Sequence, residues 1–146
     1  MKILVGIDLS DSTPMVVKKV AELSKALSAK VWLLHVADPE PDFVGYEPGP
    51  QSVRDNVAIG FQDEHRQIQD IADRLRKGGI DTKALLVQGT TVETIMKEAA
   101  MLNVDMIVVG SHGRGAMHQL VMGSVSEGVI HKSECPTLVI PTHNRT

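Results

Sequence analysis

Short apolar runs alternate with stretches of helical spacing along the whole chain. Runs rich in β-branched residues predict strands over residues 2–8, 31–36, 83–88, 105–109 and 137–140. Between the first two, Val16, Val20, Leu23 and Leu27 recur at intervals of three and four, which predicts one buried helix face. Similar spacing predicts three more helices, from about Phe61 to a stop at Gly78-Gly79, from Val92 to near Leu102, and over residues 124–132.

Five strands alternating with four helices favour an α/β fold with a parallel sheet. Right-handed crossovers then give a single three-layer, doubly wound, Rossmann-like domain over residues 1–146, with strand order 3-2-1-4-5. A segment rich in proline and glycine, residues 37–51, interrupts the pattern as an exposed, flexible excursion, and residues 142–146 form a loose polar tail.

Composition restricts the partners and the compartment. The 146 residues carry 15 Lys and Arg against 18 Asp and Glu, a net charge of −3, which lacks the cationic field that nucleic-acid binding needs. No apolar run reaches the length of a membrane helix, and no signal-peptide pattern opens the chain. The lone Cys135 excludes an internal disulfide, so we expect a cytoplasmic protein without membrane insertion.

The most distinctive polar residues follow the first and fourth predicted strands. With order 3-2-1-4-5 these two strands are neighbours whose connections leave in opposite directions, which is where ligands bind in open α/β sheets. After the fourth strand the chain reads Gly110-Ser111-His112-Gly113-Arg114-Gly115 and reaches Gly123-Ser124-Val125-Ser126 at a helix start. Glycine amides and a helix N-terminus can cradle phosphate, although such glycines can also be turn punctuation.

Two common nucleotide motifs do not fit this segment. No Gly-x-x-x-x-Gly-Lys-Ser/Thr occurs in the chain, which excludes the phosphate loop of that type. The dinucleotide fingerprint would need a glycine at position 118, which is His118, and it belongs after a first strand.

The spacing Gly110-x2-Gly113-x9-Gly123-Ser124 resembles the nucleotide-binding signature of the universal stress protein family, in its ATP-binding branch. The resemblance covers nearly the whole chain. It includes Gly-Ile-Asp-x-Ser at residues 6–10, Leu-His-Val at 34–36, Val-Val-Gly-Ser-His-Gly-Arg at 108–114 and Cys-Pro-Thr-Leu-Val-Ile at 135–140.

This resemblance implies a homodimeric, ATP-binding regulatory module of the stress response. Asp8, after Ile7, would lie beside adenine and ribose, and the main chain of Val36 would read the adenine edge. The other implied nucleotide-binding residues are Val109, Gly110, His112, Gly113, Arg114, Gly123, Ser124, Val125 and Ser126. ATP, or AMP or ADP, is the expected ligand, with Mg²⁺ bridging the phosphates.

Other interpretations of the same residues stay open. Asp8 can favour the dipole of the first helix, and Ser10 can cap that helix. His35 is interpreted as a polar position near the strand edge, and the histidines show no zinc spacing, so no protein-built metal site is expected. No Gly-x-Ser-x-Gly elbow occurs, and no catalytic residue is assigned. Slow ATP hydrolysis or self-phosphorylation on a serine such as Ser124, and a nucleotide-independent interaction protein, are the alternative functions.

The last predicted strand offers a surface for assembly. Thr137, Leu138, Val139 and Ile140 would lie at a sheet edge, and an uncovered apolar edge is a template for pairing. The family resemblance implies that two subunits meet there.

Overall fold

A computed structural model of the chain describes residues 1–38, 51–112 and 122–142. The predicted alternation of strands and helices is confirmed. The elements are β1 (Lys2–Gly6), α1 (Thr13–Leu27), β2 (Lys30–Ala37), α2 (Gln51–Lys77), β3 (Thr82–Gln88), α3 (Thr91–Leu102), β4 (Met106–Gly110), α4 (Ser124–Lys132) and β5 (Thr137–Ile140).

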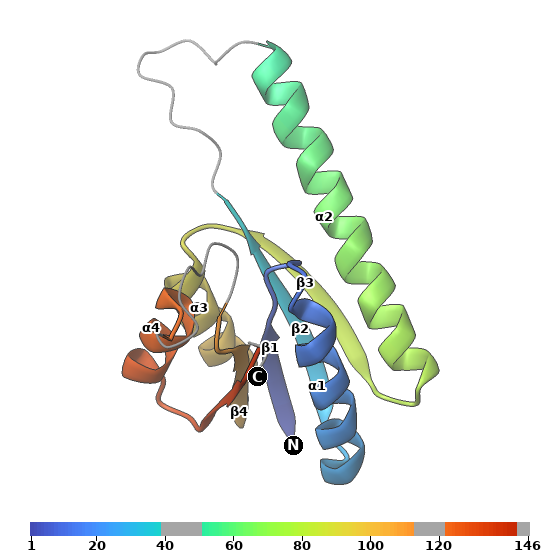
Figure 1. Cartoon of the computed structure of the whole chain (residues 1–146), viewed down its shortest axis with the longest axis vertical. Coiled ribbons are helices and arrows are strands. Elements are labelled where there is room, and N and C mark those ends of the chain that lie inside the picture. The colour runs from blue at the N-terminus through green and yellow to red at the C-terminus, as the bar shows by residue number, and fades with distance from the viewer. Residues whose placement is uncertain (39–50, 113–121, 143–146) are drawn as a thin grey trace, which may run out of the picture.

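The five strands form one parallel sheet in the predicted order, β3-β2-β1-β4-β5. β1 lies at the centre, with Val5 opposite Leu33 of β2 on one side and opposite Val108 of β4 on the other. Figure 1 shows α1 and α2 on one side of the sheet and α3 and α4 on the other. The predicted three-layer fold is therefore confirmed.

Alternate side chains of each strand enter two separate hydrophobic cores. Ile3 and Val5 of β1 pack on the α1 and α2 side, while Leu4 between them packs on the α3 and α4 side. Both faces of a central strand are covered, which explains why β1 and β2 read as nearly continuous apolar runs rather than alternating ones. Side chains of β2 alternate in the same way, with Leu33 on the α1 and α2 side and Leu34 on the α3 and α4 side.

Three predicted boundaries move at the carboxyl edge of the sheet, one of them that of β4, which runs to Gly110 rather than to residue 109. β1 ends at Gly6 rather than at Asp8, because the chain turns at Leu9, whose φ is 57°. β2 continues to Ala37, one residue into the predicted excursion, because Ala37 pairs with Gln88 of β3. Residues 39–50 of that excursion lie outside the described residues, and its last residue, Gln51, belongs to α2.

α2 begins at Gln51, ten residues before the Phe61 at which helical spacing becomes recognisable in the sequence. Gly60 lies inside this helix and breaks the pattern, although it is exposed and a Cβ there would meet nothing within 4 Å. The predicted stop at Gly78-Gly79 is confirmed: Gly79 has a φ of +87°, and the N–H of Ile80 donates back to the Leu75 carbonyl over 3.1 Å.

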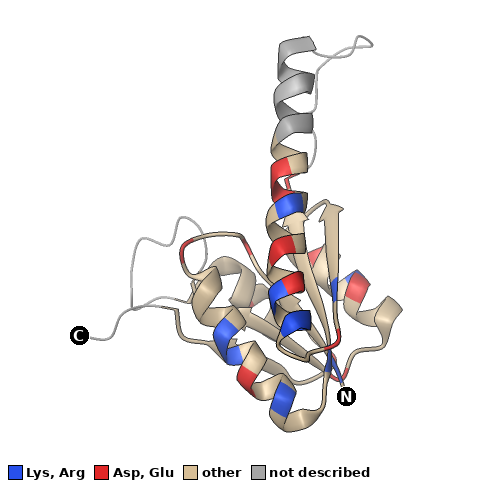
Figure 2. Ribbon diagram, turned by 90° about the vertical axis from the view of Figure 1, so that its right-hand side faces the viewer, with Lys and Arg blue, Asp and Glu red and all other residues tan. Residues whose placement is uncertain are grey.

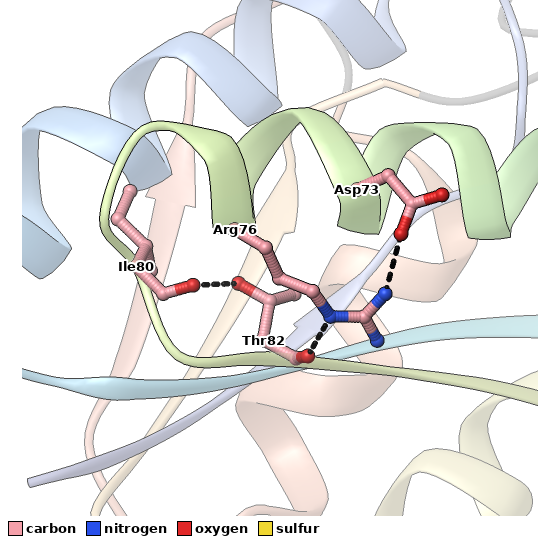
Figure 3. A network of polar contacts seen from close by, with 4 residues as sticks. All are labelled: Asp73, Arg76, Ile80 and Thr82. Carbon is pink, nitrogen blue, oxygen red and sulfur yellow. Dashed lines mark hydrogen bonds and ion pairs between the residues drawn. The ribbon is translucent and has the colours of Figure 1, made fainter.

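The end of α2 is tied to β3 by one arginine. Arg76 Nε donates to the Thr82 carbonyl over 2.7 Å, and its Nη1 pairs with Asp73 at 2.7 Å (Figure 3). The Thr82 hydroxyl donates to the Ile80 carbonyl over 3.0 Å. These contacts fix the turn at the amino edge of the sheet, opposite the carboxyl edge of the strands.

Charges of both signs are interspersed along α1 and the described part of α2 (Figure 2). Within the described ranges, no helix is both long enough and apolar enough to cross a membrane.

Candidate functional site at the carboxyl edge of the sheet

β1 and β4 are neighbours, and their connections lead to helices on opposite faces of the sheet (Figure 1). Val5 pairs with Val108, so two residues further along the strands Ile7 is level with Gly110. Asp8 therefore follows one strand end and Ser111 follows its neighbour. The structure thus brings together the two chain segments that the sequence singles out, at the edge where ligands bind in folds of this kind.

Asp8 organises the turn between β1 and α1. Its Oδ1 accepts hydrogen bonds from the Ser10 N–H at 3.0 Å, from the Ser10 hydroxyl at 2.6 Å and from the Thr13 hydroxyl at 3.4 Å. The capping interpretation of Ser10 is wrong, because the N-cap of α1 is Ser12 and no side chain caps the helix. Asp8 is partly buried close to the first turn of α1, so its carboxylate can serve both the turn and a ligand.

β2 extends past β1 at this edge, and the overhang includes Val36. The last rung between the two strands is the Ile7 N–H donating to the Leu34 carbonyl at 2.9 Å. Backbone groups of alternate residues in a strand point to opposite neighbours, so the N–H and C=O of Val36 point to the β1 side, as those of Leu34 do. Ala37 faces the other way, and its carbonyl accepts from the Gly89 N–H. Val36 can therefore present one donor and one acceptor, the pair that an adenine edge requires.

His35 is a polar position two residues before the end of β2, and the structure adds that it is buried. Its exposed fraction is 6%, and its Nδ1 lies 2.9 Å from the Ile7 carbonyl. Its Nε2 lies 3.4 Å from Oε2 of Glu64 on α2. The sequence hides this role because a histidine within an apolar strand gives no sign of its partners 28 and 29 residues away.

Thr142, which the sequence analysis assigns to a loose tail, is hydrogen-bonded to the residues that follow β4. Its N–H donates to the Ser111 hydroxyl at 3.0 Å, and its own hydroxyl donates to the His112 carbonyl at 3.0 Å and lies 3.1 Å from the His112 N–H. A Cβ on Gly110 would lie 2.9 Å from Cγ2 of Thr142. The tail interpretation is therefore wrong for Thr142, and residues 143–146 lie outside the described residues.

Hydrogen bonds join the residue that follows β4 to the first residues of α4. The Ser111 carbonyl accepts hydrogen bonds from the Gly123 N–H at 2.7 Å and from the Ser126 hydroxyl at 3.1 Å. Ser126 is 2% exposed and its hydroxyl also lies 2.9 Å from the Gly123 carbonyl, so this side chain is engaged with the chain itself. These bonds hold the first turn of α4 beside the end of β4.

The N-terminus of α4 faces this edge, and among the described residues no side chain caps it. Gly123 is its N-cap, with an extended backbone and no capping hydrogen bond, and the exposed Ser124 opens the helix. Amides of a first helical turn have no partner within the helix and favour an anion. Of the predicted phosphate residues, Gly123, Ser124, Val125 and Ser126 are thus placed together, while Gly113 and Arg114 lie outside the described residues.

Within the described parts of the chain, no three His, Cys, Asp or Glu side chains gather so as to hold a metal ion.

Comparison with known proteins adds to this geometry. The family model described as the universal stress protein family matches residues 1–141. Universal stress protein MJ0577 of Methanocaldococcus jannaschii is 28% identical, with 98% of this chain and 96% of the relative covered. A solved structure described as that of hypothetical protein MJ0577 superposes with a TM-score of 0.76 at 30% identity, covering 99% of this chain and 97% of the other.

Two further solved structures carry nucleotides. A universal stress protein in complex with cAMP superposes with a TM-score of 0.72 at 22% identity, covering 98% of both chains. One from Archaeoglobus fulgidus in complex with dAMP superposes with a TM-score of 0.65 at 20% identity, covering 96% of this chain and 97% of that one. At such identities the likeness shows the fold.

Proposed function

We propose that this chain, which belongs to the universal stress protein family, binds an adenine nucleotide at the carboxyl edge of β1 and β4. The observation that carries the proposal is the position of three features at one edge. The Val36 backbone faces the β1 side, the Asp8 carboxylate follows β1, and the uncapped N-terminus of α4 is held beside the end of β4. The cAMP and dAMP complexes of related folds support an adenine nucleotide as the ligand.

In the proposed mode, each end of the nucleotide meets a different part of the edge. The adenine edge bonds to the Val36 backbone, the ribose lies near Asp8 and Gly110, and the phosphates lie at the first turn of α4. ATP is the proposed ligand, with Mg²⁺ held mainly by phosphate oxygens and water. Ser126 contributes its backbone N–H rather than its hydroxyl, because the hydroxyl is used within the chain.

We propose further that the nucleotide acts as a regulatory ligand of a homodimer rather than as a substrate. Phosphoryl transfer needs a group that positions the nucleophile. Asp8 is the carboxylate that follows β1 at this edge, and its Oδ1 is engaged in bracing the turn at the proposed adenosine end. The dimer would form through β5, whose residues Thr137, Leu138 and Val139 are only partly buried in the single chain.

A negative charge introduced at the start of α4 tests the nucleotide site. We expect Ser124→Glu to weaken ATP binding at least tenfold, because a carboxylate would then occupy the position proposed for the phosphates. The fold should tolerate the change, since an acidic residue in a first helical turn favours the helix dipole. Isothermal titration calorimetry with ATP, ADP, AMP and cAMP measures the effect.

Ser124→Ala is the matched control, and we expect it to bind ATP within a few-fold of the wild type. The adenosine affinity of Ser124→Glu should also stay close to that of the wild type, because adenosine carries no phosphate. Absence of nucleotide binding by the wild type, or equal ATP affinity in Ser124→Glu, would overturn the proposal.

A further inference from the structure

His35 stands one residue before Val36, and its place in the β1–β2 ladder is unusual. In a parallel pair of strands the backbone hydrogen bonds are evenly spaced, so the position of one bond predicts the donor and acceptor of the next. After the bond from the Ile7 N–H to the Leu34 carbonyl, the next rung would run from the Val36 N–H to the Ile7 carbonyl. Between these described residues that rung is not made, and the Ile7 carbonyl accepts instead from the His35 ring.

The protonation of the ring at Nδ1 follows from its partner. A carbonyl oxygen only accepts hydrogen bonds, so Nδ1 must carry the proton that it donates to Ile7. Nε2 then faces Oε2 of the Glu64 carboxylate at 3.4 Å. One ring nitrogen of His35 thus lies against Glu64 on α2, while the other bonds to the Ile7 carbonyl at the end of β1.

We propose that His35 is a positioning residue for adenine, which ends the β1–β2 ladder by engaging the Ile7 carbonyl and so leaves the Val36 N–H to the base. This inference rests on the proposed nucleotide site and deepens it. Without the His35 bond, the Ile7 carbonyl and the Val36 N–H satisfy each other, because partly buried backbone groups seek partners. The edge then loses its donor for adenine N1, while the phosphate end is untouched.

Hydrogen exchange of single amides tests this without any nucleotide. We expect the Val36 amide of the wild type to exchange at least tenfold faster than the Leu34 amide, which lies within the ladder. In His35→Leu, and in the larger His35→Phe, we expect Val36 to become protected as the extra rung forms. His35→Asn is the matched control, because its side-chain amide can donate from nearly the position of Nδ1, and Val36 should stay fast. A Val36 amide in the wild type as protected as Leu34 would overturn the proposal, whether or not the variants fold.

Binding measurements then separate positioning from general stability. We expect His35→Leu to lose at least tenfold in ATP affinity and in its preference for ATP over GTP, whose base presents a donor where adenine presents an acceptor. Affinity for inorganic tripolyphosphate, which has no base, should stay unchanged, and His35→Asn should restore ATP binding. Equal ATP affinity in His35→Leu and the wild type contradicts the role of His35, whereas no ATP binding by the wild type contradicts the nucleotide site itself.

Discussion

Gly110 ends β4 at a point where the chain leaving β5 comes close to it. An added Cβ would lie 2.9 Å from Cγ2 of Thr142 and 3.3 Å from Cγ2 of Val16. Thr142 cannot swing aside freely, because its hydroxyl and N–H are bonded to His112 and Ser111. The glycine is therefore required by space at this position.

We expect Gly110→Ala to lower the free energy of unfolding by about 1–3 kcal/mol, the usual cost of overpacking a closely packed site. Urea unfolding followed by circular dichroism measures it. Adding Thr142→Ser to Gly110→Ala should recover part of the loss, since serine keeps the hydroxyl and removes Cγ2. A double variant no more stable than Gly110→Ala alone would show that the Thr142 methyl is not the obstacle.

At the scale of elements, α2 carries a glycine that its packing does not need. Gly60 is exposed within the helix, a Cβ added there would meet nothing within 4 Å, and glycine costs about 0.5–1 kcal/mol relative to alanine inside a helix. We expect Gly60→Ala to raise the free energy of unfolding by that amount in the same urea assay. Gly128→Ala in α4 is the opposite case, because its Cβ would lie 2.9 Å from Cγ2 of Val92, and it should destabilise. If both variants changed the free energy of unfolding in the same direction, this distinction would be contradicted.

The helices and strands themselves could be predicted from the sequence, because the spacing of apolar residues within each element has the period of that structure. The buried face of α1 and the glycine stop of α2 are examples, and both lie where they are expected. The start of α2 could not be found in this way, since Gly60 interrupts the spacing before Phe61.

The parts of the site that escaped prediction are contacts over a long distance along the chain. His35 meets Ile7 and Glu64, and Thr142 meets Ser111 and His112 about 30 residues away. No spacing within one element encodes such pairs. Asp8, Gly110 and Gly123 could be predicted to lie at one edge, because right-handed crossovers restrict the strand order and so make β1 and β4 neighbours.

At the scale of the whole molecule, the position of β5 at the edge of the sheet is the feature that bears on assembly. The carbonyls of Pro136 and Ile140 accept from β4 and its connection, so the backbone groups of Thr137 and Val139 point outward from the sheet. An outward N–H on an apolar edge strand can pair with a second chain.

We expect the wild type to sediment as a dimer and Val139→Pro to sediment as a monomer. Proline removes an outward N–H without removing a bond to β4, and proline is tolerated on edge strands. Analytical ultracentrifugation measures the mass, and Val139→Thr, which keeps the N–H and the β-branched shape, is the control. A Val139→Pro variant that stays dimeric would contradict pairing through the β5 backbone.

Trp32, the single tryptophan of the chain, has a practical consequence for all these measurements. It is 7% exposed on the α3 and α4 side of β2, and the Lys30 ammonium lies 5.1 Å from its ring centroid at the amino edge. Four strand residues, roughly 13 Å, separate it from Val36 at the opposite edge. Its emission should report loss of the core on melting while staying silent to a base at Val36, so tryptophan-monitored melting curves can measure ligand stabilisation free of direct quenching.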